Sequence, residues 1–209
     1  MDRTIRTIIV LAFLTLAGCN KQDLGNNDKG TNNLYEAQLL GLSINKPASW
    51  DFITSEESKA MLSSTKLEDK DMEDLVSVFY KPIVAIVKER WQLPIPSVSI
   101  TVNPDEDSPN ISPVEVLQGL SKMGYSSFKD YSIINKPEEI EIDGHKAAYM
   151  KAHYTSEIWG DTKLYPTSYE TWIVPRQGYF FMIGAVSSQS EDQTTRSEIV
   201  SIIKSIKLK

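Results

Sequence analysis

The chain has 209 residues, of which 41% are hydrophobic and 24% charged, as in an ordinary globular domain with a sizeable core. Residues 1–18 carry a net charge of +1 from Arg3, Arg6 and Asp2, so the formal charge of −6 becomes −7 when they are removed. A chain this acidic is poorly suited to general electrostatic binding of DNA, RNA or anionic head groups. We therefore expect no nucleic-acid partner.

Residues 1–18 have the layout of a secretory signal peptide. Arg3 and Arg6 form a short positive segment, and an apolar run extends from Thr7 to Ala17. This run has about 11 residues, whereas a helix needs about 20 to cross the bilayer core, so a permanent transmembrane anchor is the weaker interpretation. We expect the segment to be cleaved.

The sequence Leu16-Ala17-Gly18-Cys19 contains the only cysteine of the chain and resembles the lipobox of bacterial lipoproteins. In that class the cysteine thiol is diacylated, the chain is cut before it, and the new amine is acylated. The resemblance implies stable attachment to the membrane through covalent lipid at Cys19. The alternative is a plain signal peptide with a chance cysteine. Asn20 replaces the aspartate that typically retains such proteins at the inner membrane, which favours the outer membrane.

Residues 19–36 are expected to form a lipidated, flexible tether, because residues 20–33 are polar and turn-rich with a single aliphatic side chain. The folded region is expected to begin near Tyr35, and we assign residues 37–209 to a single domain without internal repeats. With Cys19 acylated no disulfide can form, so packing alone must stabilise this domain.

The first part of the domain predicts short strands and a capped helix. Residues 42–44 alternate as in a half-buried strand, which Pro47 ends and Trp50 covers. Thr54 and Glu57 fit a capping box at the start of a helix. The other elements expected here are the body of that helix to about residue 64, an acidic helical segment over 69–80, and strands over 83–87 and 98–102.

A second helix is predicted from Ser112. The serine, Pro113 and Glu115 supply a hydroxyl cap, a proline at the first helical position and the glutamate of a capping box. Gly124 suits a left-handed C-terminal cap. The apolar stripe at helical spacing consists of Val114, Leu117, Leu120 and Met123.

Two hairpins are predicted next. Asp143-Gly144 is a favoured two-residue turn, followed by a strand over 146–154 with one apolar face. A second hairpin joins 169–174 to 179–186 across residues 175–178. Together they predict the core of a meandering antiparallel sheet.

The chain closes with a third helix. Ser190 is expected to cap it, with Gln193 three residues later. Basic residues at 204, 207 and 209 complement the C-terminal end of the helix dipole. The apolar stripe consists of Ile199, Ile202, Ile203 and Ile206.

This order of elements resembles the PsbP-like fold, which the PsbP extrinsic subunits of photosystem II share with the DcrB-like bacterial lipoproteins. The resemblance is carried by the opening strand with Pro47 and Trp50, the turn at 142–147, the hairpin ending at 179–183, and the closing helix with Ile202, Ile203 and Ile206. It implies an α+β fold in which an antiparallel β-sheet is flanked by helices, a PsbP-like α/β/α sandwich. It also implies a role in binding or assembly. Two segments, 55–80 and 104–112, are longer than the family's usual spacing.

The residues offer no catalytic constellation. The chain lacks Gly-x-Ser-x-Gly, and its two histidines are expected at a hairpin turn (His145) and on a polar strand face (His153). We expect neither an enzyme nor a cofactor. Asp105 and Asp107 lie in an oxygen-rich loop and are weak candidates for a metal site, namely calcium, although the spacing of a calcium-binding loop is absent.

Aromatic residues supply the candidates for a partner surface. Trp172 and Tyr179 lie on paired strands and are expected in the core. Trp159 and Tyr165 flank a polar segment that reads as an exposed loop between strands, where aromatic side chains often anchor partners. We predict partner binding at this loop.

The leading hypothesis is a membrane-anchored envelope lipoprotein with a non-enzymatic role in protein binding or envelope complex assembly. It rests on the lipobox, the tether and the lack of a catalytic motif. The alternative is a small-ligand or calcium-binding module of the cell envelope, using the acidic loop or a cleft beside the sheet.

Overall fold

The computed structural model describes residues 33–63, 65–66, 81–88, 93–104, 112–158 and 160–209. Within these ranges the fold is α+β, and every described strand pair is antiparallel. A small sheet has the order β1-β2-β11. Its elements are β1 (Leu34–Ala37), the 3-10 helix η1 (Gln38–Leu40), β2 (Leu42–Asn45) and β11 (Lys207–Leu208).

An eight-stranded sheet forms the body of the molecule, with the order β3-β5-β6-β10-β9-β8-β4 and with β7 also paired to β8. Its strands are β3 (Asp51–Ile53), β4 (Thr65–Lys66), β5 (Val84–Val87), β6 (Ser97–Pro104), β7 (Lys129–Ile142), β8 (His145–Ile158), β9 (Leu164–Arg176) and β10 (Tyr179–Ser188). The helices are α2 (Ser55–Ser63), α4 (Pro113–Ser127) and α5 (Gln193–Lys204). In the described part of the chain, no helix is long and apolar enough to cross a membrane.

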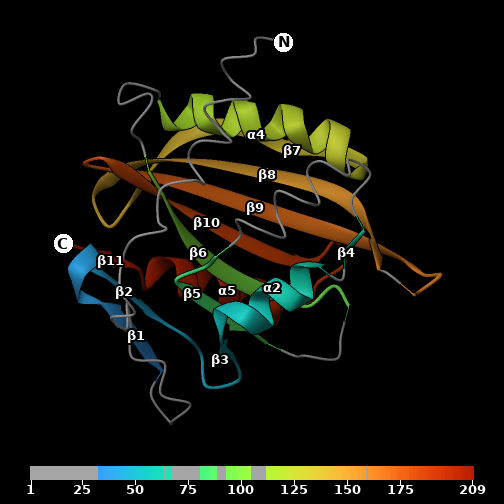
Figure 1. The fold of residues 1–209 in the computed structure, drawn as a ribbon, viewed down its shortest axis with the longest axis horizontal. Helices are drawn as coiled ribbons and strands as arrows, with labels where there is room; N and C mark the ends of the chain where they lie inside the picture. Colours follow the sequence, from blue (N-terminus) through green and yellow to red (C-terminus); the bar gives the residue numbers. More distant parts are fainter. Residues whose placement is uncertain (1–32, 64, 67–80, 89–92, 105–111, 159) are drawn as a thin grey trace.

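The large sheet lies between two covering layers (Figure 1). On one face Leu117 of α4 packs on Met150 and Ile173, and α2 packs on the same face at the β3–β5 end. The alternate residues of the same strands, such as Trp172, face α5 and the small sheet. This arrangement confirms the expected antiparallel sheet flanked by helices. The small sheet is an addition to the layer that contains α5.

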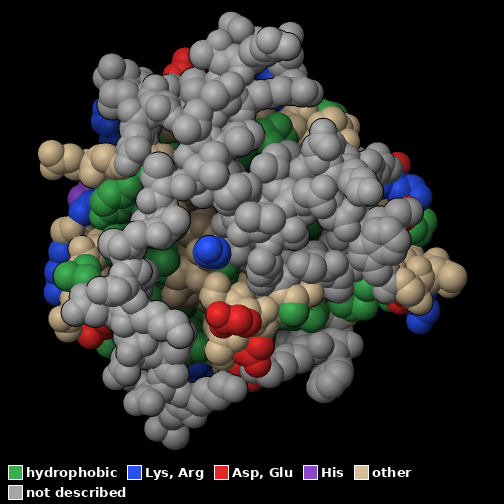
Figure 2. Space-filling view, in the orientation of Figure 1, with side chains coloured by type: hydrophobic (Ala, Val, Ile, Leu, Met, Phe, Trp, Pro, Cys, Tyr) green, Lys and Arg blue, Asp and Glu red, His purple; other side chains and the backbone are tan. Residues whose placement is uncertain are grey.

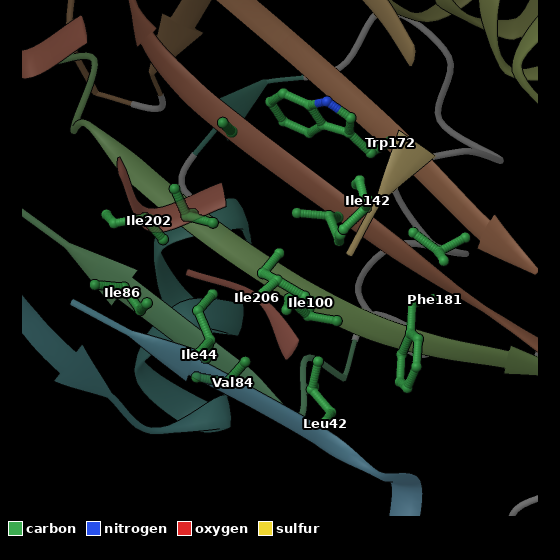
Figure 3. Packing of buried hydrophobic residues seen from close by; sticks show 14 of the residues in the cluster. Leu42, Ile44, Val84, Ile86, Ile100, Ile142, Trp172, Phe181, Ile202 and Ile206 are labelled. Carbon is green, nitrogen blue, oxygen red and sulfur yellow. The ribbon is translucent and has the colours of Figure 1, made fainter. Parts of the chain in front are cut away.

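The main core lies between the large sheet, α5 and the small sheet (Figure 3). Trp172 is 7% exposed, which confirms it as a core residue, whereas Tyr179 is partly buried and packs against the core. Trp50 has no exposed surface and also belongs to this core. Side chains distant in sequence converge there, including Ile44, Ile86, Ile100, Ile202 and Ile206.

The local signals at several element ends are confirmed. Thr54 and Glu57 exchange side-chain and backbone hydrogen bonds at the start of α2, and Ser112 and Glu115 do the same for α4. Asp143 and Gly144 both have positive φ, 48° and 77°, as a two-residue hairpin turn of the I′ type requires.

Three details of the helix ends differ from expectation. Gly124 lies inside α4, where a Cβ would approach the ring of Tyr131 to 2.3 Å, so its role is close packing and not a left-handed cap. Asp192, not Ser190, caps α5 and accepts the Thr195 N–H at 2.7 Å. Lys207 lies beyond α5, in β11.

The boundaries of two segments also differ. β1 begins at Leu34 and buries Tyr35, so residues 34–36, which the polar composition upstream assigned to the tether, belong to the folded sheet. The β9–β10 turn is Gln177-Gly178 alone, because Arg176 and Pro175 already pair with β10. The helical segment expected over 69–80 lies outside the described residues.

Candidate functional site

The predicted partner site lies at the far end of the β8–β9 hairpin, which projects at one end of the sheet (Figure 1). The prediction that Tyr165 lies on a loop is wrong. Tyr165 lies inside β9, where it pairs with Ser156. The strand signal was masked by Pro166, because a proline inside a short polar stretch usually indicates a turn. Trp159 lies outside the described residues.

Asp161 organises this hairpin end. Its carboxylate accepts the Lys163 backbone N–H at 2.9 Å and the Tyr165 hydroxyl. The hydrogen bond from Tyr165, followed by that from Lys163, lowers the pKa of Asp161, and the same bond raises the pKa of Tyr165. The tyrosine ring is therefore fixed in place by a charged acceptor.

Leu164 and Pro166 flank the fixed tyrosine and are exposed, Leu164 by 53%. Because strand neighbours alternate, these two side chains point to the opposite face from Tyr165. The hairpin end thus presents apolar and aromatic groups on both faces, held by strand pairing. Such a surface suits contact with another macromolecule better than bond-making chemistry.

The two histidines lie in different surroundings. His145 at the hairpin turn is half-buried, and its ring lies 3.3 Å from the carbonyl oxygen of Leu208 and from Arg176. His153 does point away from Ala152 and Tyr154, as expected, but it is half-buried, and burial followed by the charge of Lys151 lowers its pKa. Among the described residues, no group of three or more His, Cys, Asp or Glu could hold a metal ion. Asp105 and Asp107 lie outside these residues.

A buried carboxylate, which the sequence did not lead us to expect, lies where β9 meets α5. Glu170 is 2% exposed. Its carboxylate accepts hydrogen bonds from both terminal guanidinium nitrogens of Arg196 and, at 2.6 Å, from the hydroxyl of Tyr149. The ammonium group of Lys151 lies 3.9 Å away. Burial, then the bond to Glu170, raises the pKa of Tyr149. Every oxygen of this carboxylate is engaged within the protein.

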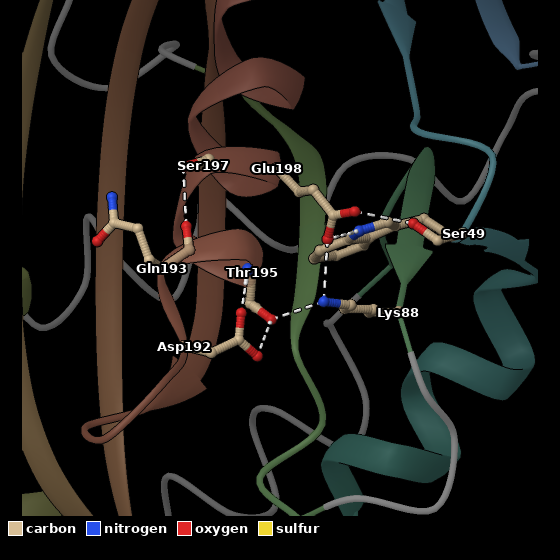
Figure 4. Close-up of polar contacts among 8 residues, drawn as sticks. Ser49, Lys88, Asp192, Gln193, Thr195, Ser197 and Glu198 are labelled. Atoms are coloured by element: carbon tan, nitrogen blue, oxygen red, sulfur yellow. Dashed lines mark hydrogen bonds and ion pairs between the residues drawn. The ribbon is translucent and has the colours of Figure 1, made fainter.

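A second carboxylate, Glu198, joins α5 to the segment before β3 (Figure 4). It accepts the Trp50 ring N–H at 3.0 Å and the Ser49 hydroxyl at 2.9 Å, and it pairs with Lys88 at 3.0 Å. Lys88 also donates to the Thr195 hydroxyl at 2.7 Å. Burial alone would raise the pKa of Glu198, but these hydrogen bonds outweigh it and lower that pKa.

Both carboxylates serve the fold, because each is saturated by groups of the chain itself. The sequence contains a signal for the buried position of Glu170. Glu170 lies two residues before Trp172 on the same strand and therefore shares its core face, and a charge buried in such a position requires a cation. The sequence contains no such signal for Glu198, since it is one of several polar residues on a helix and its partner Trp50 is 148 residues away.

No protein-family model and no curated protein sequence matches the chain. Solved structures similar to it include LpqN of Mycobacterium tuberculosis, described as involved in cell envelope biogenesis, with 15% identity, TM-score 0.47, and 80% of this chain and 82% of that chain covered. They also include the PsbP protein of Synechocystis sp. PCC 6803, CyanoP, with 13% identity, TM-score 0.45, and 93% and 99% coverage. A Bacteroides thetaiotaomicron protein has 11% identity and TM-score 0.44, with 81% of this chain and 45% of that chain covered. A PsbP protein is thus among the similar structures, as the sequence resemblance predicted.

Proposed function

We propose that this chain is a non-enzymatic lipoprotein of the bacterial cell envelope, held at the periplasmic face of the outer membrane by lipid on Cys19, and that its folded domain binds a protein partner. The observation that carries the proposal is the lipobox at residues 16–19, at the end of a signal-peptide pattern. Two or more acyl chains make such an anchor stable.

The start of the folded domain fits this anchoring. β1 begins at Leu34, 15 residues after Cys19, so the connecting chain spans at most about 50 Å. The domain is therefore confined near the membrane, which raises its effective concentration toward partners in the same membrane or just beside it.

The β8–β9 end supplies the proposed partner surface. Tyr165 is fixed by Asp161, and Leu164 beside it is half exposed without packing on the core. An aromatic ring that is already ordered loses little entropy on binding, and the adjacent leucine adds apolar area.

Site-specific photocrosslinking in living cells tests both parts. A photoreactive residue at Leu164 should yield one specific adduct, whereas the same residue at Ile134 on β7, which is similarly exposed at 50%, should not. The adduct should weaken in a Cys19→Ala form, because that form leaves the membrane.

Lipidation itself is tested by labelling with radioactive palmitate. Incorporation that disappears in Cys19→Ala supports the anchor, and equal labelling of both forms would contradict it. Equal adducts from positions 164 and 134, or none from either, would overturn the partner surface while leaving the anchor intact.

A further inference from the structure

The end of the molecule opposite the far end of the β8–β9 hairpin carries the most exposed of the large apolar side chains in the described ranges (Figure 1). Leu39 is 85% exposed, at the tip of η1 between β1 and β2. Its neighbour Leu40 packs against the core instead. The tip therefore presents a single leucine to the outside.

The tip is held rigidly. Gly41 has a left-handed φ of 61°, and its N–H bonds the Gln38 carbonyl. Its own carbonyl accepts the Lys209 N–H at 2.9 Å, and a Cβ at position 41 would lie 2.8 Å from the Lys209 oxygen. The turn that carries Leu39 is thus braced by Lys209, the residue after β11.

Four cations lie at the same end of the molecule as this tip. Lys207 lies in β11, and Lys209 directly follows that strand. Arg176 donates to the Lys209 carbonyl, and Lys146 lies just after the Asp143-Gly144 turn, whose Asp143 pairs with Lys207. Figure 2 shows Lys and Arg side chains along the edge of the molecule where Figure 1 places the C-terminus.

Among the described residues at this end, the carboxylates are fewer than the cations. They are Asp143, Glu141 opposite Lys146, and Glu36 on β1, three against the four cations. The chain as a whole carries −6, whereas the described residues at this end are not acidic on balance, so an anionic membrane surface repels them less.

We propose that Leu39 and the surrounding cations form a contact face for the phospholipid bilayer in which Cys19 is anchored. This inference rests on the lipid anchoring proposed above. Leu39 lies five residues after the start of β1, the first described strand after Cys19, so the small sheet is the described part of the fold nearest to the anchor along the chain. The leucine enters the boundary between head groups and acyl chains, and the ammonium and guanidinium groups contact lipid phosphates.

A bilayer contact at Leu39 also sets the orientation of the domain relative to the membrane. β8 has 14 residues and spans roughly 45 Å between its ends. His145 at one end contacts β11, whereas Leu164 pairs with Glu157 at the other end. With Leu39 at the bilayer, the partner surface at Leu164 points away from the membrane.

Fluorescent labelling of the full, lipidated chain tests this contact face. Acylated Cys19 has no free thiol, so Leu39→Cys introduces a single reactive position, and Leu164→Cys supplies a matched control at the opposite end. Both side chains are exposed, so neither change disturbs packing. Each protein carries an environment-sensitive dye and is reconstituted into vesicles of phosphatidylethanolamine and phosphatidylglycerol.

The emission of the dye at position 39 should shift to shorter wavelength and become quenched by brominated lipid, while the dye at position 164 should show neither change. An unchanged dye at position 39 on vesicle-bound protein would overturn the contact face and leave Leu39 available for a protein partner. Equal shifts at both positions would overturn it as well. Protein that fails to sediment with vesicles would instead contradict the lipid anchor itself.

Discussion

Two carboxylates attach α5 to the rest of the fold, and they do so in opposite surroundings. Glu170 points from the sheet toward the helix, its side chain is 3% exposed, and it depends on Arg196. Glu198 points from the helix toward Trp50 and Lys88, and its side chain is 21% exposed. Water can replace a lost partner of Glu198, whereas a lost partner of Glu170 leaves a charge in the interior.

This difference matters for function because α5 leads directly into the proposed membrane end. The Ser205 hydroxyl at the end of α5 accepts the Asn45 N–H at 2.9 Å, and β11, which follows, pairs with β2. Loosening of α5 is therefore transmitted to the strand that braces the Leu39 tip.

Arg196→Ala should give the largest loss of stability. It removes the guanidinium group that bonds both oxygens of Glu170, and breaking a buried pair in this way costs about 3 to 5 kcal/mol. The free energy of unfolding from urea titration measures it. The double variant E170Q/R196M removes both charges and should recover part of the loss. A cost for Arg196→Ala below about 1 kcal/mol would show that Glu170 is hydrated and that the contrast with Glu198 is wrong.

Glu198→Ala should have an intermediate effect. It leaves the ring N–H of the fully buried Trp50 without its acceptor, which costs about 2 kcal/mol, and it leaves Lys88 bonded to the Thr195 hydroxyl without a paired carboxylate. Glu198→Gln keeps an acceptor at the same place and should cost less. Urea titration of both variants tests this order. If Glu198→Ala were as costly as Arg196→Ala, the distinction between the two carboxylate clamps, Glu170 with Arg196 and Glu198 with Trp50 and Lys88, would be lost.

These two clamps also show which features of the fold could be predicted from the sequence and which could not. The strands and helices follow from local patterns, such as the Ser112 capping box and the alternation along β8, because each pattern lies within one element. Their α/β/α arrangement was expected only from the resemblance to the PsbP-like fold. The pairing of Glu198 with Trp50 depends on how elements 148 residues apart pack, which no local pattern encodes. Tyr165 was assigned correctly to the hairpin end but wrongly to a loop, because local turn propensity was overridden by pairing with β8.

The pH dependence of stability should distinguish the two clamps further. The folded-state pKa of Glu198 lies below the ordinary value of 4.5, so its contribution to stability is complete above that value and is lost as the pH falls through the folded pKa. Thermal melting in this acid range should show a smaller decline for Glu198→Gln than for the unaltered protein. Parallel declines in the two proteins would contradict an ionised, hydrogen-bonded Glu198.

A third carboxylate, Asp143, extends the comparison to the surface and should give the smallest effects. Its partner Lys207 has a side chain that is 61% exposed, so Lys207→Ala should leave the urea midpoint unchanged within error, as for most exposed ion pairs. Asp143 also accepts the backbone N–H of Leu208 at 2.8 Å, and this bond holds β11 against the β7–β8 turn. Asp143→Ala should therefore speed hydrogen exchange at the Leu208 amide, while Lys207→Ala should not. Equal exchange in both variants would mean that β11, and with it the Leu39 tip, is held by its pairing with β2 alone.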